Sequence, residues 1–213
     1  MNNCYPIEVL MFLPQGFEDL EAITIIDVFG WTHIRSHLTS IHLKTCAFHS
    51  HVVGKFGTTI KVDYTITENI LDYRSFDTYR AFVLPGGFHD AGFDEAYSAA
   101  IHQIATRIYG NNGVIATMCV GISPIADAGL LHGKKATTYS LNREHDNVAR
   151  LEAGGASYTG QQIEEDDSII SSSGPASALE VALLVVEKLT GKANTDEIKT
   201  LMTYSPCRDA VEA

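Results

Sequence analysis

Short apolar runs that alternate with helix-like segments constrain the fold of this chain most. The strand-like runs cover residues 7–13, 41–48, 80–84, 113–118 and 168–172. The segments with helical periodicity cover residues 18–31, 94–109, 119–128, 175–189 and 195–202, the last capped by Asn194. This alternation predicts an α/β fold in which a mostly parallel central sheet has helices on both faces, which makes three layers. A hairpin is expected within residues 52–62, a strand at 135–138 and a short helix at 142–150.

The length of 213 residues, with no repeat or linker dividing the chain, predicts one domain over residues 1–213, with a core at 7–202 and a short tail at 203–213. The net charge is −11 and no basic cluster interrupts it, so nucleic acid and anionic membrane surfaces are disfavoured as partners. No apolar stretch approaches the roughly 18 residues of a membrane span. The first basic residue is Arg35, so the start lacks the charged segment of a secretory signal. We therefore expect a cytoplasmic protein.

The four cysteines are Cys4, Cys46, Cys119 and Cys207, and their wide spacing indicates neither a zinc module nor a disulfide framework. Scattered cysteines are most often small buried hydrophobic residues. Cys119 alone has a distinctive position, because it ends an apolar strand and precedes Val120, Gly121 and a helical segment. This pattern is typical of a nucleophile on a sharp strand-to-helix turn. The adjacent helix N-terminus predicts a thiol that is partly or largely thiolate at neutral pH.

Three of the predicted strands are followed by residues that could form a turn or a reactive site, at positions 14–18, 85–87 and 119. Sites in parallel sheets form at the carboxyl ends of the strands, so we expect these segments to meet there. His42, His49 and His51 alternate near Cys46, which is compatible with metal binding, but solvated histidines on an edge strand are the simpler interpretation. No phosphate-binding glycine motif is present. The sequence therefore predicts neither a metal nor a cofactor.

Five motifs occur in a fixed order along the chain. They are Gln15-Gly16-Phe17-Glu18-Asp19-Leu20-Glu21, Leu84-Pro85-Gly86-Gly87, Met118-Cys119-Val120-Gly121, Gly133-Lys134-Lys135-Ala136-Thr137-Thr138 and Ser173-Gly174-Pro175. This set resembles the ThiJ/PfpI superfamily, and within it the branch that holds the parkinsonism-associated deglycase and its bacterial relatives. The resemblance implies a flavodoxin-like sandwich, usually a homodimer. It also implies a reactive cysteine on a nucleophile elbow, with a glutamate of the first helix beside it.

By motif, that glutamate is Glu18, and a protonated Glu18 could donate a hydrogen bond to the sulfur of Cys119. The alternative is that Glu18 is only a first-turn helix charge. Backbone N–H groups of the Gly86-Gly87 loop and of Val120 are expected to face a developing oxyanion. Ser123 lies one helical turn after Cys119 and either offers its hydroxyl to the pocket or is an ordinary helix serine.

The chain departs from the family pattern at Tyr139, where enzymatic relatives commonly carry a histidine, and at Ser173, where some carry arginine. Tyrosine is a poor general base at neutral pH, although it can donate a hydrogen bond. His89, two residues after Gly87, and His145 are the available substitutes, unless both are plain surface histidines.

The first helix carries an apolar stripe of Leu20, Ile23, Ile26 and Trp31, which predicts a core-facing side. The apolar face over residues 23–34 is larger than a peripheral helix needs to pack against a sheet. This favours a subunit interface on the same helix.

Three functions are compatible with these residues. In the first, implied by the resemblance, Cys119 attacks a small reactive carbonyl such as methylglyoxal in a cofactor-free glyoxalase or deglycase reaction. In the second, Cys119 is oxidised and the protein is a stress sensor or chaperone without turnover. In the third, the protein is a peptidase or amidase, which ranks last because the usual histidine is absent.

Overall fold

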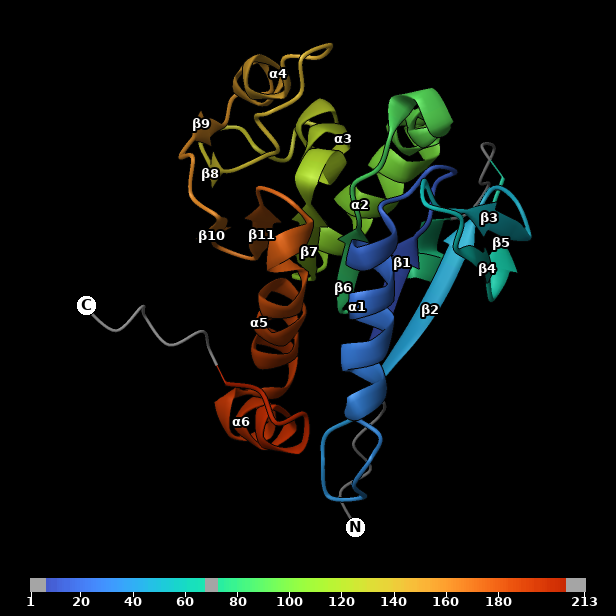
Figure 1. The fold of residues 1–213 in the computed structure, drawn as a ribbon, viewed down its shortest axis with the longest axis vertical. Helices are drawn as coiled ribbons and strands as arrows, with labels where there is room; N and C mark the ends of the chain where they lie inside the picture. Colours follow the sequence, from blue (N-terminus) through green and yellow to red (C-terminus); the bar gives the residue numbers. More distant parts are fainter. Residues whose placement is uncertain (1–6, 68–72, 206–213) are drawn as a thin grey trace.

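A parallel sheet runs through the computed structural model, which describes residues 7–67 and 73–205 (Figure 1). Within these residues its strand order is β10-β11-β7-β6-β1-β2-β5. The strands are β1 (Ile7–Phe12), β2 (Ile41–Ala47), β5 (Tyr64–Thr65), β6 (Ala81–Leu84), β7 (Val114–Met118), β10 (Ile163–Asp166) and β11 (Ile169–Ser172). Every pairing is parallel except that of β10 with β11. The predicted mostly parallel sheet is confirmed.

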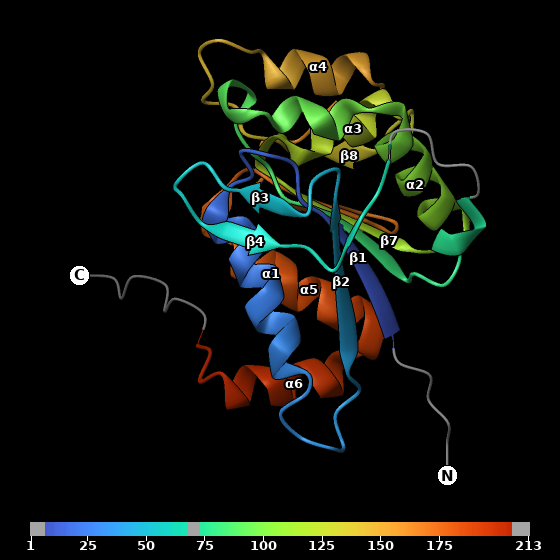
Figure 2. The same ribbon diagram turned by 90° about the vertical axis from the view of Figure 1, so that its right-hand side faces the viewer.

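Helices cover both faces of this sheet and make three layers (Figure 2). One layer holds α1 (Asp19–Trp31), α5 (Ala178–Thr190) and α6 (Lys192–Leu201), and the other holds α2 (Ala99–Gly110) and α3 (Ile122–Asp127), with α4 (Asn147–Ala153) packed on α3. The side chains of β1 alternate between the two cores: Val9 and Met11 face α1 and α5, whereas Leu10 and Phe12 face α2. Because both faces are buried from Val9 onward, the strand is apolar from Val9 to Phe12, whereas Glu8 lies at its half-buried start.

Smaller elements complete the described chain. The expected hairpin is present as β3 (His51–Val53) paired antiparallel with β4 (Thr59–Lys61). A separate two-stranded ribbon joins β8 (Lys135–Ala136) to β9 (Ser157–Tyr158). The 3₁₀ turns are η1 (Tyr73–Phe76), η2 (His89–Ala91), η3 (Phe93–Tyr97), η4 (Cys119–Gly121) and η5 (Pro175–Ser177). Across residues 7–67 and 73–205, none of the helices has the length and hydrophobicity that crossing a membrane requires. Cys4 and Cys207 lie outside the described residues.

α3 and α5 begin three residues later than predicted, each after a 3₁₀ turn, and three other helix starts differ for local reasons. The segment 94–109 is split, because Ser98 is extended (ψ 150°) and ends η3 before α2 begins. The helix expected at 142–150 begins only at Asn147, where the side chain of Asp146 caps the N–H of Ala149. Asn194 does not cap the last helix. It lies inside α6, and its side chain accepts a 2.9 Å hydrogen bond from the Thr39 N–H.

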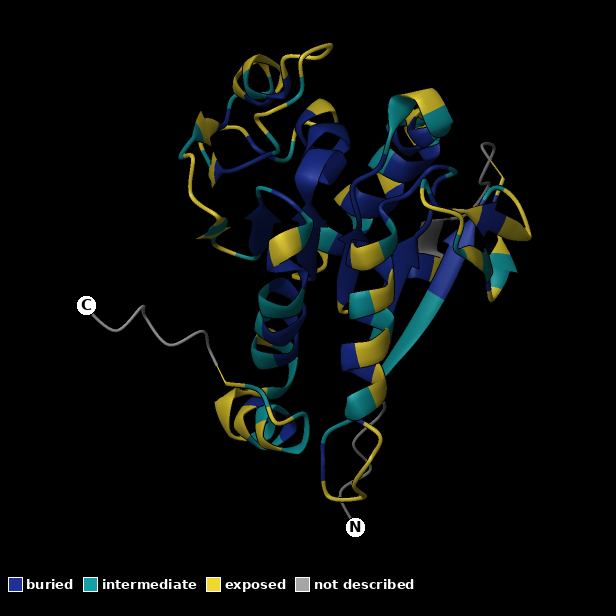
Figure 3. Cartoon of the chain, viewed as in Figure 1, coloured by how far each residue is buried: buried dark blue, intermediate teal, exposed yellow. Residues whose placement is uncertain are grey.

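The buried face of α1 is also not the predicted one. Leu20 and Ile23 are 54% and 41% exposed, whereas Ala22, Ile25 and Phe29 are buried against the sheet and α5. Figure 3 shows that α1 carries both buried and exposed residues. The helix is rotated because it packs against both neighbours and not only against the sheet.

Candidate active site

Cys119 lies on a strained turn between β7 and the short η4–α3 helical segment. Its φ of +53° is in the left-handed region, which costs a non-glycine residue on the order of 1–3 kcal/mol. The Thr138 hydroxyl holds this turn by donating a 3.0 Å hydrogen bond to the Cys119 carbonyl. A Cβ on Gly121 would lie 2.5 Å from the Leu84 carbonyl oxygen, so only glycine lets the turn pack this closely. The strand, sharp turn and helix therefore follow the predicted pattern.

Two carboxyl groups of α1 lie near this turn. Glu18 is the N-cap residue, and its Oε2 accepts a 2.8 Å hydrogen bond from the Glu21 N–H. Glu21 is fully buried, and its Oε2 accepts a 2.6 Å hydrogen bond from the Gly86 N–H. Its second oxygen, Oε1, is buried and has no hydrogen-bond partner among the described residues.

The burial of Glu21 decides its charge. Desolvation raises the pKa of this carboxyl to about 8, against the opposing effect of the Gly86 hydrogen bond and with a further rise from the charge of Glu18. Glu21 is therefore protonated at neutral pH and carries a proton that it can donate. Burial also raises the pKa of Glu18.

The structure thus brings both glutamates to the site but gives them different places. Glu18, which the motif pointed to, lines the pocket and caps the helix. Glu21 has the stronger electrostatic effect on Cys119. A Cβ added at Gly86 would lie 2.6 Å from the Cys119 Cβ and 3.1 Å from Glu21 Oε2. The side chains of Cys119 and Glu21 therefore pack on either side of Gly86, where a larger residue would not fit. Sequence reasoning missed Glu21. Its spacing of three residues from Glu18, which places both on one side of a helix, was the available signal.

The thiol of Cys119 is not the thiolate that the sequence led us to expect. Burial raises its pKa, and negative charge on Glu21 or Glu18, when either carboxyl is ionised, raises it further, while the Val120 N–H opposes the shift by hydrogen bonding. The resting group is therefore a neutral thiol. The titrations of Cys119 and Glu21 are coupled, because each negative charge disfavours the other.

The loop after β6 is fastened to the start of α1. The Glu18 N–H donates to the Gly86 carbonyl at 2.9 Å, and the Phe88 N–H donates to the Gly16 carbonyl at 2.9 Å. The Gly86 N–H is already bound to Glu21, so it does not face a developing oxyanion as expected. Among the described residues, the candidate donors for such an oxygen are the N–H of Gly87 and the N–H of Val120, which also hydrogen-bonds to Cys119, and both residues line the pocket.

A pocket of about 470 Å³ opens above Cys119. It is lined by Glu18, Phe56, Gly87, Phe88, His89, Asp90, Cys119, Val120, Tyr139, Leu141, Asn142, Arg143, Glu144, His145 and Pro175. Phe56 enters from the β3–β4 hairpin, which Asp19 holds by accepting 2.9 Å hydrogen bonds from the N–H groups of Phe56 and Thr58. The pocket wall is therefore tied to α1 on this side.

The auxiliary residues expected from the sequence divide into two groups. His89, His145 and Tyr139 all line the pocket, and the rings of His89 and His145 lie 4.7 Å apart. Ser123 is fully buried in α3 and does not line it, so the structure does not support its hydroxyl as a pocket group. His49 is paired with Glu95, and the described residues contain no cluster of three or more metal-ligating side chains.

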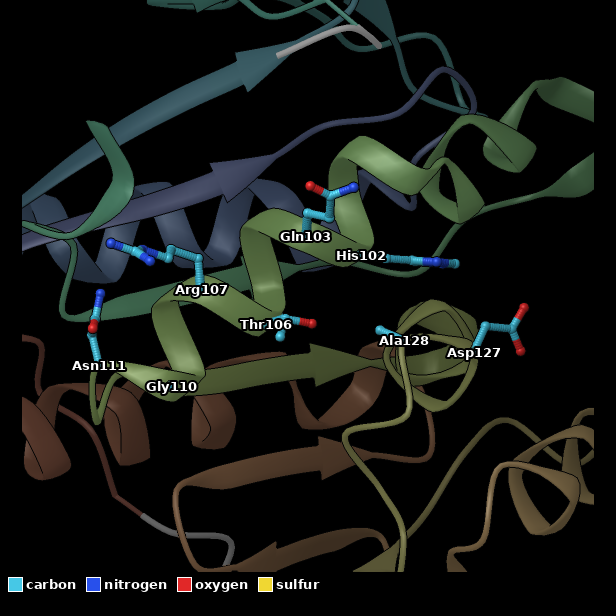
Figure 4. A pocket seen from close by; sticks show the side chains of 8 residues that line it. All are labelled: His102, Gln103, Thr106, Arg107, Gly110, Asn111, Asp127 and Ala128. Carbon is cyan, nitrogen blue, oxygen red and sulfur yellow. The ribbon is translucent and has the colours of Figure 1, made fainter. Parts of the chain in front are cut away.

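A second hollow, of about 650 Å³, lies along α2 near the end of α3 (Figure 4). Its lining is His102, Gln103, Thr106, Arg107, Gly110, Asn111, Asp127 and Ala128. Arg107 is bound to Asp77, and the lining includes no cysteine. The pocket above Cys119 is therefore the candidate active site.

Comparisons with known proteins agree with this fold. Protein DJ-1 homolog A of Arabidopsis thaliana is 25% identical over 93% of this chain, which spans about half (47%) of that protein. The Parkinson disease protein 7 homolog of Danio rerio is 24% identical, over 89% of this chain and 93% of its own length. The Deglycase PfpI of Pyrococcus furiosus is 28% identical, over 62% of this chain and 72% of its own length.

Solved structures show the same fold at low sequence identity. The crystal structure of Drosophila melanogaster DJ-1beta superposes with a TM-score of 0.76 at 22% identity, over 94% of this chain and all (100%) of that one. Oxidized DJ-1 of Toxoplasma gondii superposes with a TM-score of 0.75 at 22% identity, over 94% of this chain and 100% of that one. The family model described as DJ-1/PfpI matches residues 7–188, and the chain therefore belongs to the DJ-1/PfpI family.

Proposed function

We propose that this protein is a cofactor-free enzyme of the glyoxalase or deglycase type, in which Cys119 attacks small reactive carbonyl compounds. One observation carries the proposal. Cys119 lies on a strained turn, and on the other side of Gly86 lies the buried carboxyl of Glu21, whose second oxygen has no hydrogen-bond partner among the described residues and whose pKa burial raises to about 8. The P. furiosus relative is named a deglycase, which supports the same class of reaction.

The arrangement suits addition of a thiol to an aldehyde. The sulfur of Cys119 bonds to the aldehyde carbon, the C=O double bond becomes a single bond, and the carbonyl oxygen takes up a proton. The thiol loses its proton to the carboxyl pair of Glu18 and Glu21, and this pair returns one proton to the carbonyl oxygen. The N–H groups of Gly87 and Val120 stabilise the oxygen while it carries negative charge. The product is a hemithioacetal on Cys119.

Formation of lactate from methylglyoxal tests this proposal. The wild-type protein should form lactate without an added thiol or metal, and Cys119→Ser should reduce kcat/KM at least about 100-fold because serine is the weaker nucleophile. Cys46→Ser is the matched control, since Cys46 is fully buried and outside the pocket. Unchanged lactate formation in Cys119→Ser would exclude the proposed role of Cys119.

A second candidate function is oxidation of Cys119 as a stress signal. It is favoured by the contrast between the two described cysteines, since Cys119 faces the pocket whereas Cys46 is sealed in the core. After mild peroxide treatment, peptide mass spectrometry should find oxidation at Cys119 well ahead of Cys46. Equal oxidation of Cys4, Cys46, Cys119 and Cys207 would contradict a specific sensor.

Peptidase or amidase activity has weaker support. That chemistry needs a histidine hydrogen-bonded to the nucleophile. Within residues 7–67 and 73–205, the pocket histidine with a hydrogen-bonded side chain is His89, whose partner is Asp94 and not the sulfur.

A further inference from the structure

His89 and Asp94 form an oriented pair at the edge of the Cys119 pocket. Nδ1 of His89 lies 2.8 Å from Oδ1 of Asp94, and the side chain of His89 is only 17% exposed. The imidazole also stacks on Tyr97, with ring centroids 5.7 Å apart and an interplanar angle of 20°. It meets the edge of Phe93 at 5.4 Å. The ring is therefore fixed by packing on two sides and by one hydrogen bond.

The contact with Asp94 selects one form of the imidazole. A carboxylate can only accept a hydrogen bond, so Nδ1 carries the proton and donates it. Nε2 is then left with a free lone pair, which is the atom that a general base uses. Asp94 is 76% exposed, so the pair adds little to stability, and its effect is on the tautomer and orientation of the ring.

The other two auxiliary residues of this pocket are less suited to proton transfer. Tyr139 stands at the family's histidine position, but a phenol is a weak base at neutral pH. His145 is exposed, and its described ring contact is with His89 itself. His89 thus combines a position in the pocket wall, restricted motion and a carboxylate partner.

We propose that His89, positioned by Asp94, is the general base that moves the carbon-bound proton of the substrate after it has bonded to Cys119. This inference rests on the proposed function. The step applies where the carbonyl compound of the proposed function has a second carbonyl on the adjacent carbon, as methylglyoxal does, because that carbonyl acidifies the carbon-bound proton and accepts the electron pair.

The proposed step balances without a cofactor. In the adduct of methylglyoxal, Nε2 of His89 removes the proton from the carbon bonded to sulfur, and the electron pair moves to form an enediolate. The imidazolium then returns a proton to the neighbouring carbon. The first carbon is oxidised to a thioester while the second is reduced to an alcohol. Water cleaves the thioester to release lactate and restores the thiol of Cys119.

The test separates adduct formation from proton transfer. Lactate formation measures the whole reaction, and protection of Cys119 from iodoacetamide by methylglyoxal measures the adduct alone. For His89→Gln we expect kcat to fall about 100- to 1000-fold, the usual contribution of a general base, while protection stays within about twofold of wild type. Added imidazole should partly restore lactate formation in His89→Ala, which a purely structural defect would not allow.

The matched control is His49→Gln. His49 is also a histidine paired with a carboxylate, Glu95 at 3.0 Å, but it does not line the Cys119 pocket, and kcat should not change. For the positioning residue, Asp94→Asn should lower kcat about tenfold at constant KM, and Asp94→Glu should recover most of the loss.

Three results would overturn the proposal. If His89→Gln keeps the kcat of wild type while the wild-type activity depends on Cys119, the general-base role of His89 is excluded. The proposed function is then unaffected. Loss of Cys119 protection together with activity, without rescue by imidazole, shows a structural role instead. No lactate from the wild-type protein overturns the proposed function and this inference together.

Discussion

The Gly86 N–H donates a 2.6 Å hydrogen bond to Oε2 of Glu21, and this contact joins the loop after β6 to the first turn of α1. The bond holds the Glu21 carboxyl close to the turn that carries Cys119. A Cβ at Gly86 would contact both side chains, which shows how closely they pack around this glycine. The same contact occupies the Gly86 N–H, and Oε1 of Glu21 has no hydrogen-bond partner within residues 7–67 and 73–205. Most of what distinguishes this site follows from that bond.

Glu21 should make the stability of the protein depend on pH. Its pKa is raised to about 8 in the folded protein from an ordinary value of 4.5, so its full contribution is present below pH 4.5 and is lost as the pH rises to about 8. The free energy of unfolding of wild type should therefore fall by a few kcal/mol over this range, since each unit of pKa shift corresponds to about 1.4 kcal/mol. Urea denaturation at pH 5 and pH 8 measures it.

Glu21→Gln provides the comparison, because an amide keeps the shape and cannot ionise. Most of the pH dependence between pH 5 and pH 8 should disappear in this variant and should persist in Glu18→Gln. The same slope in wild type and Glu21→Gln would show that Glu21 does not titrate in this range.

The thiol of Cys119 should react faster as the pH rises, without a plateau near neutrality. Burial raises its pKa, so the thiolate fraction increases about tenfold per pH unit over pH 7–9. Rates of iodoacetamide alkylation, followed by peptide mass spectrometry, measure this. Glu21→Gln should react faster than wild type only above about pH 8, where the wild-type carboxyl is ionised. A rate that levels off below pH 7 would show a depressed pKa instead.

Gly86→Ala should disturb the site and the fold together. The new methyl group would lie 2.6 Å from the Cys119 Cβ, and overpacking of this kind typically costs about 1–3 kcal/mol. Gly30→Ala in α1 is the control, because no atom lies within 4 Å of its Cβ position. That variant should gain roughly 0.5–1 kcal/mol from helix propensity. Thermal and urea denaturation distinguish them, and equal stability of the two variants would contradict the packing argument.

We also propose that the exposed apolar face of α1 is where two copies of the chain associate. Leu20 and Ile23 are 54% and 41% exposed there. Light scattering should show a dimer for wild type and a monomer for the double variant Leu20→Lys, Ile23→Lys. Val53→Lys, at a 45% exposed site on β3, should remain dimeric. A monomeric wild type, or a double variant that stays dimeric, would rule out this interface.

Sequence reasoning succeeded where local signals were strong. The apolar runs of three central strands are followed by Pro14, Pro85 and Cys119, and the structure has β1, β6 and β7 in these runs. β10 was missed because Ile163–Asp166 carries three acidic residues, which this edge strand tolerates because all of its side chains are half-buried or exposed.

The site was harder to predict in detail, because it depends on how α1 is rotated. Tertiary packing buries Ala22 and Ile25 and exposes Leu20, and the same rotation turns Glu21 toward Gly86. A motif places a glutamate in the first turn but cannot tell Glu18 from Glu21. The thiol pKa was predicted in the wrong direction because the helix N-terminus was considered without the burial of the sulfur.

The most direct test of the central claim compares lactate formation from methylglyoxal by wild type, Cys119→Ser and Glu21→Gln under identical conditions. If Cys119 and Glu21 act together, kcat/KM should fall at least about 100-fold in Cys119→Ser and at least about tenfold in Glu21→Gln, because the amide cannot exchange a proton. Full activity of Glu21→Gln, with a stable fold, would contradict the account.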